Sequence, residues 1–344
     1  MKELCSMTLQ ELTEWVESKE ERPFVASQIF DWVYKKQVLT FDEMLNIRKS
    51  FRALCKEELA FPVLEKIKTE ISDDKETYKT LWRLKDGRLV ESVLICSEDR
   101  RTVCVSSQVG CPARCAFCAS GKEGLIRHLS PAEILEQILH TERDLRQKGE
   151  KVSNIVFMGM GEPLDNYDTV VKTIRFLNDP SLMNMSQRRI TVSTVGVIEG
   201  IYKLAEEDLK VNLVLSLHAP NQKIRQKIIP YARKYALEDV MKAMDHYAEK
   251  TKRDLTFEYT LIAGINDQVE HAEELATLVE SRQCTVNLIP YNPVLGLRLV
   301  RPSFEVVSAF RDALDERGVI NTCRYTKGDD IAAACGQLVL RTVT

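Results

Sequence analysis

The sequence of 344 residues lacks any apolar run long enough to cross a membrane, and its start, Met1–Glu3, lacks the apolar core of a signal peptide. Its net charge of −3 argues against a protein coated with nucleic acid, although a local basic surface over an acidic remainder is still allowed. It has no internal repeat and no low-complexity tract. Because ten cysteines occur without an export signal, we expect a cytoplasmic enzyme that uses thiols as ligands or redox groups.

Hydrophobic periodicity predicts two kinds of segment. Up to about residue 60 it predicts short amphipathic helices, over Leu9–Ser18, Phe24–Lys35 and Phe41–Glu58. Next, Thr77–Arg83 and Leu89–Ile95 alternate on either side of a turn at Asp86-Gly87, which predicts a β-hairpin.

From about residue 100, apolar strands alternate with helices such as Pro131–Lys148 and His271–Ser281. The predicted strands are Thr102–Ser106, Asn154–Met158, Arg189–Ser193, Asn212–Leu217, Thr256–Leu261, Thr285–Ile289 and Val319–Tyr325. Alternation implies parallel strands, and polar motifs after most strands favour a partial (β/α)6 barrel over a doubly wound sheet. We therefore expect an α/β protein with a helical accessory domain (1–60), a β-hairpin region (61–98) and a barrel with a C-terminal segment (99–344).

Three cysteines form a compact motif. Cys111, Cys115 and Cys118 lie in Cys-Pro-Ala-Arg-Cys-Ala-Phe-Cys, with no fourth cysteine nearby. A closed zinc site needs four protein ligands, and a ferredoxin-type cluster normally uses four thiolates. Three thiolates on a tight loop suit a [4Fe–4S] cluster with one iron open to another ligand. The alternatives are a zinc knuckle completed by a distant histidine, or three unligated core thiols.

Polar residues follow several of the predicted strands. Gly159-Met160-Gly161-Glu162-Pro163 comes directly after Asn154–Met158, where glycines allow close approach to a ligand and Glu162 can accept from an ammonium group. Equivalent strand-end positions are occupied by Ser193, Ser216-Leu217-His218 and Asn292. In a barrel these positions converge on one cavity, whereas each side chain alone could simply cap a strand or a helix.

Two further cysteines lie far apart in the sequence. Cys335 is followed by Gly336 near the C-terminus, and Cys104 lies on the first barrel strand, seven residues before Cys111. They are either packing thiols or a pair that faces the same cavity.

Together these motifs resemble the radical S-adenosylmethionine (SAM) RNA methyltransferases that modify adenine at C2, over nearly the whole chain. The resemblance rests on Gln28–Lys36, Cys104–Cys111, Phe157–Leu164 and Ala334–Leu338. The sequence departs from the family pattern at Arg114, which lies inside the cysteine loop. It departs again at Ala332, which replaces an acidic residue, so the sequence does not show which contacts hold Cys335 in place.

The resemblance implies a role for each site residue. Cys111, Cys115 and Cys118 hold a [4Fe–4S] cluster, Cys335 carries the transferred methyl group, Cys104 is the resolving thiol and Glu91 is the proton acceptor. The residues that contact SAM are Gly161, Glu162, Ser193, Ser216, Leu217, His218 and Asn292. From the residues alone, Glu91 could instead pair with a basic residue of the hairpin.

The resemblance also implies the reaction and its partners. C2 of adenine is too electron-poor to attack a SAM methyl group directly, so two SAM molecules are used per turnover, with a transient protein–RNA crosslink and a Cys104–Cys335 disulfide. The expected partners are 23S rRNA, tRNA and an electron donor such as flavodoxin or ferredoxin. The protein itself is expected to be a monomer that binds no membrane. Two alternatives remain: a C8-specific 23S rRNA adenine methyltransferase of the antibiotic-resistance type, and a non-catalytic iron–sulfur RNA-binding protein.

Overall fold

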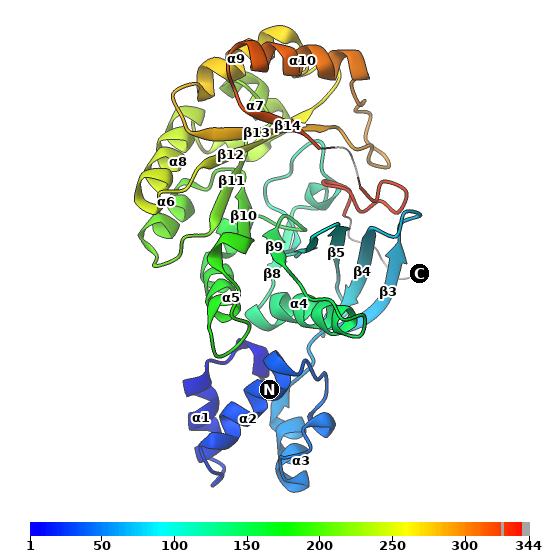
Figure 1. Ribbon diagram of the computed structural model, residues 1–344, viewed down its shortest axis with the longest axis vertical. Helices are drawn as coiled ribbons and strands as arrows, with labels where there is room; N and C mark the ends of the chain where they lie inside the picture. The colour runs from blue at the N-terminus through cyan, green and yellow to red at the C-terminus, as the bar shows by residue number, and fades with distance from the viewer. Residues whose placement is uncertain (325–326, 339–344) are drawn as a thin grey trace.

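The computed structural model describes residues 1–324 and 327–338 (Figure 1). At the N-terminus, α1 (Leu9–Glu17) begins at a capping box in which Thr8 accepts from the Glu11 backbone, and α2 (Phe24–Phe30) continues into a π-helical turn. The single helix predicted over Phe41–Glu58 is wrong. A 3-10 turn covers Phe41–Glu43 and α3 covers Lys49–Glu58, because the backbone leaves the helical conformation at Met44 (ψ 68°) and re-enters it only after Arg48 (ψ 137°).

Ten strands form one sheet in the order β14-β13-β12-β11-β10-β9-β6-β5-β4-β3. Seven of them are parallel: β6 (Arg100–Cys104), β9 (Asn154–Phe157), β10 (Ile190–Thr194), β11 (Asn212–Ser216), β12 (Leu255–Leu261), β13 (Cys284–Pro290) and β14 (Asn321–Cys323). They match the seven strands predicted from about residue 100, although Tyr325 of the last prediction lies outside the described residues.

The predicted hairpin extends this sheet instead of lying apart from it. β4 (Thr77–Arg83) pairs with β5 (Leu89–Ser97), and β5 pairs antiparallel with β6, so that Val93 lies opposite Cys104. An additional edge strand, β3 (Glu65–Ile71), was not predicted, because its lysines and glutamates leave no run of apolar residues. The hairpin is therefore part of the wall that faces the barrel interior.

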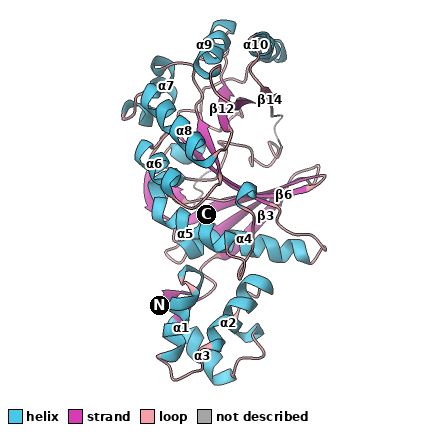
Figure 2. Ribbon diagram, turned by 60° about the vertical axis from the view of Figure 1, so that its left-hand side comes forward, coloured by secondary structure: helices cyan, strands magenta, loops and turns pink. Residues whose placement is uncertain are grey.

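Helices cover the outer side of the parallel strands (Figure 2). They are α4 (Pro131–Arg146), α5 (Tyr167–Asn178), α6 (Ile198–Glu206), α7 (Gln222–Ile228), α8 (Leu237–Thr251), α9 (Val269–Val279) and α10 (Phe304–Glu316). The apolar residues of the strands and helices form a common core with the N-terminal helices. Burial of this surface is the main stabilising contribution to the fold. No helix within the described residues is long and apolar enough to span a bilayer.

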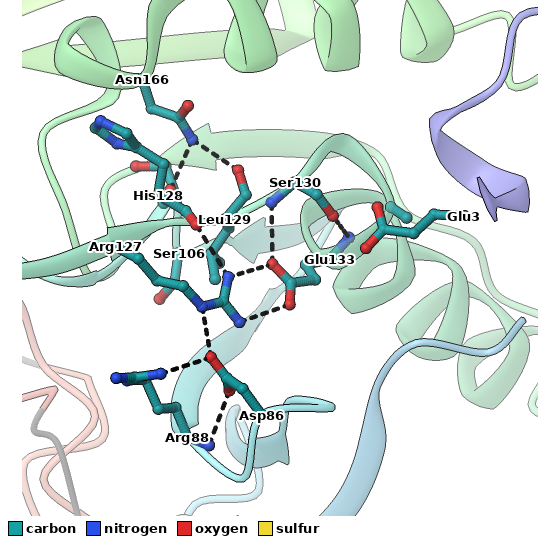
Figure 3. Close-up of polar contacts among 12 residues, drawn as sticks. Glu3, Asp86, Arg88, Ser106, Arg127, His128, Leu129, Ser130, Glu133 and Asn166 are labelled. Atoms are coloured by element: carbon teal, nitrogen blue, oxygen red, sulfur yellow. Dashed lines mark hydrogen bonds and ion pairs between the residues drawn. The ribbon is translucent and has the colours of Figure 1, made fainter. Parts of the chain in front are cut away.

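Arg127 links the hairpin to the barrel (Figure 3). It lies on β8 (Leu125–His128), which pairs with β7 (Gln108–Gly110). Its guanidinium donates to both carboxylate oxygens of Glu133, in the first turn of α4, at 2.8 Å and to Asp86, in the β4–β5 turn, at 2.7 Å. A bidentate pair of this kind fixes direction as well as distance. The hairpin tip is thereby held against the start of α4.

Candidate active site

The three cysteines of the motif line one wall of a cavity of about 810 Å³ at the carboxyl ends of the parallel strands. Their loop is anchored by the Ala116 amide, which donates to the Ile228 carbonyl at the end of α7 (2.8 Å). Burial raises the pKa of all three thiols, Cys111, Cys115 and Cys118, so ionised thiolates here require a compensating positive charge.

Within residues 1–324 and 327–338, no three His, Cys, Asp or Glu side chains are grouped around a point that would bind a single metal ion. The three sulfurs instead share a cavity wall. That arrangement fits a cubane cluster, in which each thiolate binds a different iron atom.

Glu162 lines the same cavity and is held by backbone amides. It accepts hydrogen bonds from Val195 (2.8 Å) and Leu164 (3.0 Å), while its own amide donates to the Gln108 side chain. Gly161 precedes it with φ of 118°, and a Cβ there would lie 2.8 Å from Gln108. Burial raises the pKa of Glu162 to about 7, although both amides act in the opposite direction.

The strand ends of β10 and β11 complete the cavity. Ser193 and Ser216 lie side by side, with 3.0 Å between their hydroxyl oxygens. His218 has a left-handed backbone (φ 54°), and its Nδ1 accepts from the Thr260 amide at 2.9 Å, which leaves the proton on Nε2. Burial lowers the pKa of His218 to about 3, so the ring is neutral, and it packs edge-on against Phe117.

Cys335 is carried by a loop, residues 327–338, that closes over the cysteine motif. The Ala119 amide donates to the Gly336 carbonyl (2.7 Å), and the Asn292 side chain donates to the Cys335 carbonyl (3.1 Å). Cys335 is exposed within the cavity, yet the surrounding protein raises the pKa of its thiol to about 12, first by desolvation and then through the charge of Glu258.

The local support of this loop comes from the sheet. Lys79 on β4 is 2% exposed, and its ammonium donates to the carbonyl of Ile331 and, at 3.4 Å, to that of Ala332. Ala332 itself has φ of 50°, which is unfavourable for a residue with a Cβ. Backbone contacts to a buried lysine therefore support the loop at the position where the family's acidic residue is missing.

Cys104 and Cys335 share a second cavity, of about 1110 Å³, that joins the first. Cys104 ends β6 and is 8% exposed, and burial raises its pKa. Val93 and Ile95 of β5 form part of the apolar wall, and Arg324 and Lys327 are its basic residues. No disulfide joins any of the ten cysteines, all of which lie within the described residues.

Two predicted site residues line neither cavity. Leu217 is fully buried; its amide donates to the Glu258 carbonyl, so it shapes the strand end through its backbone. Glu91, on the face of β5 that also carries Val93, is 1% exposed and lies 3.8 Å from the Lys79 ammonium. The structure thus contains the hairpin ion pair that was the alternative for Glu91, next to the second cavity.

The other predicted residues meet at the joined cavities, which are lined by Cys104, Cys111, Cys115, Cys118, Gly161, Glu162, Ser193, Ser216, His218, Asn292 and Cys335. Sequence reasoning missed Glu258 and Lys79. Glu258 lies between Phe257 and Tyr259 in a predicted strand, and this contrast was a usable signal, whereas Lys79 lies between Tyr78 and Thr80 and gave no such signal.

Comparisons with known proteins agree with this geometry. Residues 105–277 match the model of the radical SAM superfamily, and residues 2–60 match the ribosomal RNA large subunit methyltransferase N-terminal domain. The probable dual-specificity RNA methyltransferase RlmN 2 of Protochlamydia amoebophila is 62% identical over 96% of this chain and 93% of its own length. The probable RlmN of Thermotoga sp. strain RQ2 is 45% identical over 100% and 99%.

The fold agrees with a solved relative as well. The crystal structure of a radical SAM methyltransferase from Sphaerobacter thermophilus superposes with a TM-score of 0.96 at 42% identity, covering 98% of this chain and 99% of that one. These findings confirm the predicted α/β radical SAM fold and the predicted enzyme class. A [4Fe–4S] cluster and SAM are the cofactors that this superfamily implies. The chain therefore belongs to the RlmN family of radical SAM RNA methyltransferases.

Proposed function

We propose that this enzyme methylates C2 of adenine in 23S rRNA and in tRNA, with Cys335 as the methyl carrier. The observation that carries the proposal is the pair of joined cavities. The three-cysteine loop and Glu162 line the first, Cys104 lines the second, and Cys335 lines both. A protein that only bound RNA would need neither Glu162 nor two further thiols at the same place.

We assign the cavity residues by the chemistry of their donors. Cys111, Cys115 and Cys118 hold the [4Fe–4S] cluster, which supplies the electron for reductive cleavage of SAM. Glu162 accepts from the SAM amino group, and the remaining SAM contacts are Gly161, Ser193, Ser216, Leu217, His218 and Asn292. A neutral His218 with its proton on Nε2 offers one directed donor without adding charge.

The two further cysteines act in sequence. The Cys335 thiol must lose its proton before its sulfur accepts the methyl group of a first SAM, and the sulfonium charge of that SAM offsets the desolvation that raises its pKa. The cluster and a second SAM would together remove one hydrogen atom from the methyl group on Cys335, so that its carbon could bond to C2 of adenine, with one electron returned to the cluster and the C2 proton lost to a base. Attack of the Cys104 thiolate on the Cys335 sulfur would then break the sulfur–carbon bond. The released carbon takes up a proton to become the new methyl group, and the two sulfurs form a disulfide.

Glu91 is the proposed acceptor of the C2 proton. Its carboxylate lies 3.8 Å from the Lys79 ammonium, on the face of β5 that also carries Val93 of the second cavity. General-base action also requires hydrogen-bond reach of the proton. The apolar walls of the second cavity suit an adenine ring extruded from its stack, as base chemistry requires.

We propose that residues 1–60 form an RNA-binding accessory domain, joined through the hairpin region 61–98 to the catalytic unit 99–344. We further propose that the protein is a monomer reduced by a flavodoxin or a ferredoxin.

The product distinguishes C2 from C8 methylation. Pro163 after Gly161-Glu162 and Asp329 before Asp330 favour the C2 branch. RNA from cells that lack the gene and from complemented cells should be hydrolysed and measured by mass spectrometry. We expect 2-methyladenosine to disappear from rRNA and tRNA on deletion and to return on complementation. Loss of 8-methyladenosine instead would contradict the proposal.

SAM binding should depend on pH through Glu162. Its pKa of about 7 means that the carboxylate is mostly protonated at pH 6 and mostly ionised at pH 8. Only the ionised form accepts fully from an amino group, so the affinity for SAM should fall roughly tenfold between pH 8 and pH 6. Equilibrium binding to the reconstituted enzyme measures this change. Glu162→Gln should bind more weakly and with a flat profile; a wild-type profile as flat as that of the variant would contradict the assignment.

A further inference from the structure

Helix α7 contributes an arginine that is completely buried beside the cysteine loop. Among the lysines and arginines in the part of the chain that the structure describes, only Lys79 and Arg225 are buried. The Arg225 guanidinium donates to the carbonyls of Val195 (2.5 Å), Ser216 (3.2 Å) and Leu217 (3.2 Å), which lie at the ends of β10 and β11. Its remaining nitrogen, Nη1, is buried without a hydrogen-bond partner.

Two short connections join Arg225 to the groups that face the cavity. The Val195 amide donates to Glu162 and the Val195 carbonyl accepts from Arg225, so both side chains contact the backbone of the same residue. One turn further along α7, the Ile228 carbonyl accepts from Ala116, which lies between Cys115 and Phe117. The charge of Arg225 also lowers the pKa of the Cys115 thiol, against the larger effect of burial.

This positive charge has no solvent to stabilise it. Burial lowers the pKa of Arg225 to about 10, which still leaves the guanidinium charged at neutral pH. Carbonyl dipoles satisfy three of its hydrogen bonds, but a buried charge also needs a charge of opposite sign to offset its desolvation. The groups of opposite sign that influence it are Glu162 and the Cys115 sulfur.

We propose that Arg225 is a positioning residue that fixes one positive charge behind the cysteine loop and thereby makes the cluster easier to reduce. The inference rests on the proposed [4Fe–4S] site. Three thiolates make that site anionic, and reduction adds one further electron from an external donor without a proton. In a low-dielectric interior, a fixed cation stabilises the reduced state more than the oxidised one.

The test is a potentiometric titration of the anaerobically reconstituted full-length protein without SAM or RNA. Dithionite donates the electrons, and electron paramagnetic resonance measures the reduced cluster. Arg225→Gln removes the charge, and Arg225→Lys retains it. Lys227→Met serves as the matched control, because it removes the same charge from an exposed position on the same helix, where solvent screens it.

We expect Arg225→Gln to lower the ratio of reduced to oxidised cluster at a fixed potential at least tenfold, which is a shift of about 59 mV or more to more negative potential for a one-electron step. The reduction potential of Arg225→Lys should shift much less, because the positive charge is retained. Its thermal stability should nevertheless fall, because the forked contacts of the guanidinium to three carbonyls are lost. Lys227→Met should leave the potential unchanged.

Three results would overturn the inference. They are a wild-type reduction potential in Arg225→Gln, a shift in potential in Lys227→Met equal to that in Arg225→Gln, or a tenfold lower ratio of reduced to oxidised cluster in Arg225→Lys. If Arg225→Gln does not fold or bind iron, the comparison of Arg225→Lys with wild type decides. Failure of the proposed function would be seen separately, as a wild-type protein that binds no iron or methylates no adenine.

Discussion

Cys104→Ala is expected to trap the enzyme as a covalent adduct with its RNA. Formation of the adduct needs only Cys335, whereas its release needs attack by the Cys104 sulfur, so the reaction should stop after a single event per enzyme molecule. The adduct should appear as a band that survives denaturation and collapses to the mass of the free protein on nuclease treatment. Mass spectrometry of the digested band should locate the remaining nucleotide on Cys335.

The second catalytic cysteine gives the complementary result. Cys335→Ala lacks the methyl acceptor, so neither a methylated protein nor an adduct should form, while iron content stays at the wild-type level. The double variant Cys104→Ala/Cys335→Ala should behave like Cys335→Ala, because Cys335 acts first. A Cys104→Ala enzyme that turns over normally, or a Cys335→Ala enzyme that still crosslinks, refutes the assignment of the two thiols.

Removal of any thiol of the three-cysteine loop is expected to abolish the cluster altogether. The wild-type protein should bind about four irons per chain after anaerobic reconstitution. Cys111→Ala, Cys115→Ala and Cys118→Ala should each lose this iron and with it all reductive cleavage of SAM. Iron and sulfide analysis, together with detection of 5′-deoxyadenosine, measures both effects.

Cys284→Ala provides the control for this series. Cys284 begins β13, at the opposite end of the strand from the cavity, and lines neither cavity. Its removal should leave iron content and SAM cleavage unchanged. A wild-type protein that retains zinc in place of iron would instead support the zinc-knuckle alternative and end the radical mechanism.

The sequence was sufficient for features that depend on local pattern. Parallel strands such as Asn154–Phe157 are short apolar runs between helices, and their length, their β-branched residues and their position between helices identify them. Residues at the carboxyl ends of such strands, Glu162 and Ser193 among them, meet in one cavity because parallel strands place those ends together. The spacing of Cys111, Cys115 and Cys118 required no tertiary information.

Features that depend on tertiary contacts could not be read in the same way. Arg225 lies on a short helix whose other charged residues are exposed, so nothing local marks it as buried. The Lys79 contacts to Ile331 and Ala332 join residues that are more than 250 positions apart. β3 is defined by its pairing with β4, since its alternating lysines and glutamates resemble a solvated loop.

The pairing of β5 with β6 has a consequence for how the enzyme is restored between turnovers. Cys104 is buried in a strand that is bonded to neighbours on both sides, so its sulfur is confined to one place. Cys335 is exposed on a loop. Of the two sulfurs in the proposed disulfide, that of Cys335 is therefore the one that faces solution. A reducing thiol from solution then has access to the Cys335 sulfur alone, and Cys104 is the thiolate that leaves.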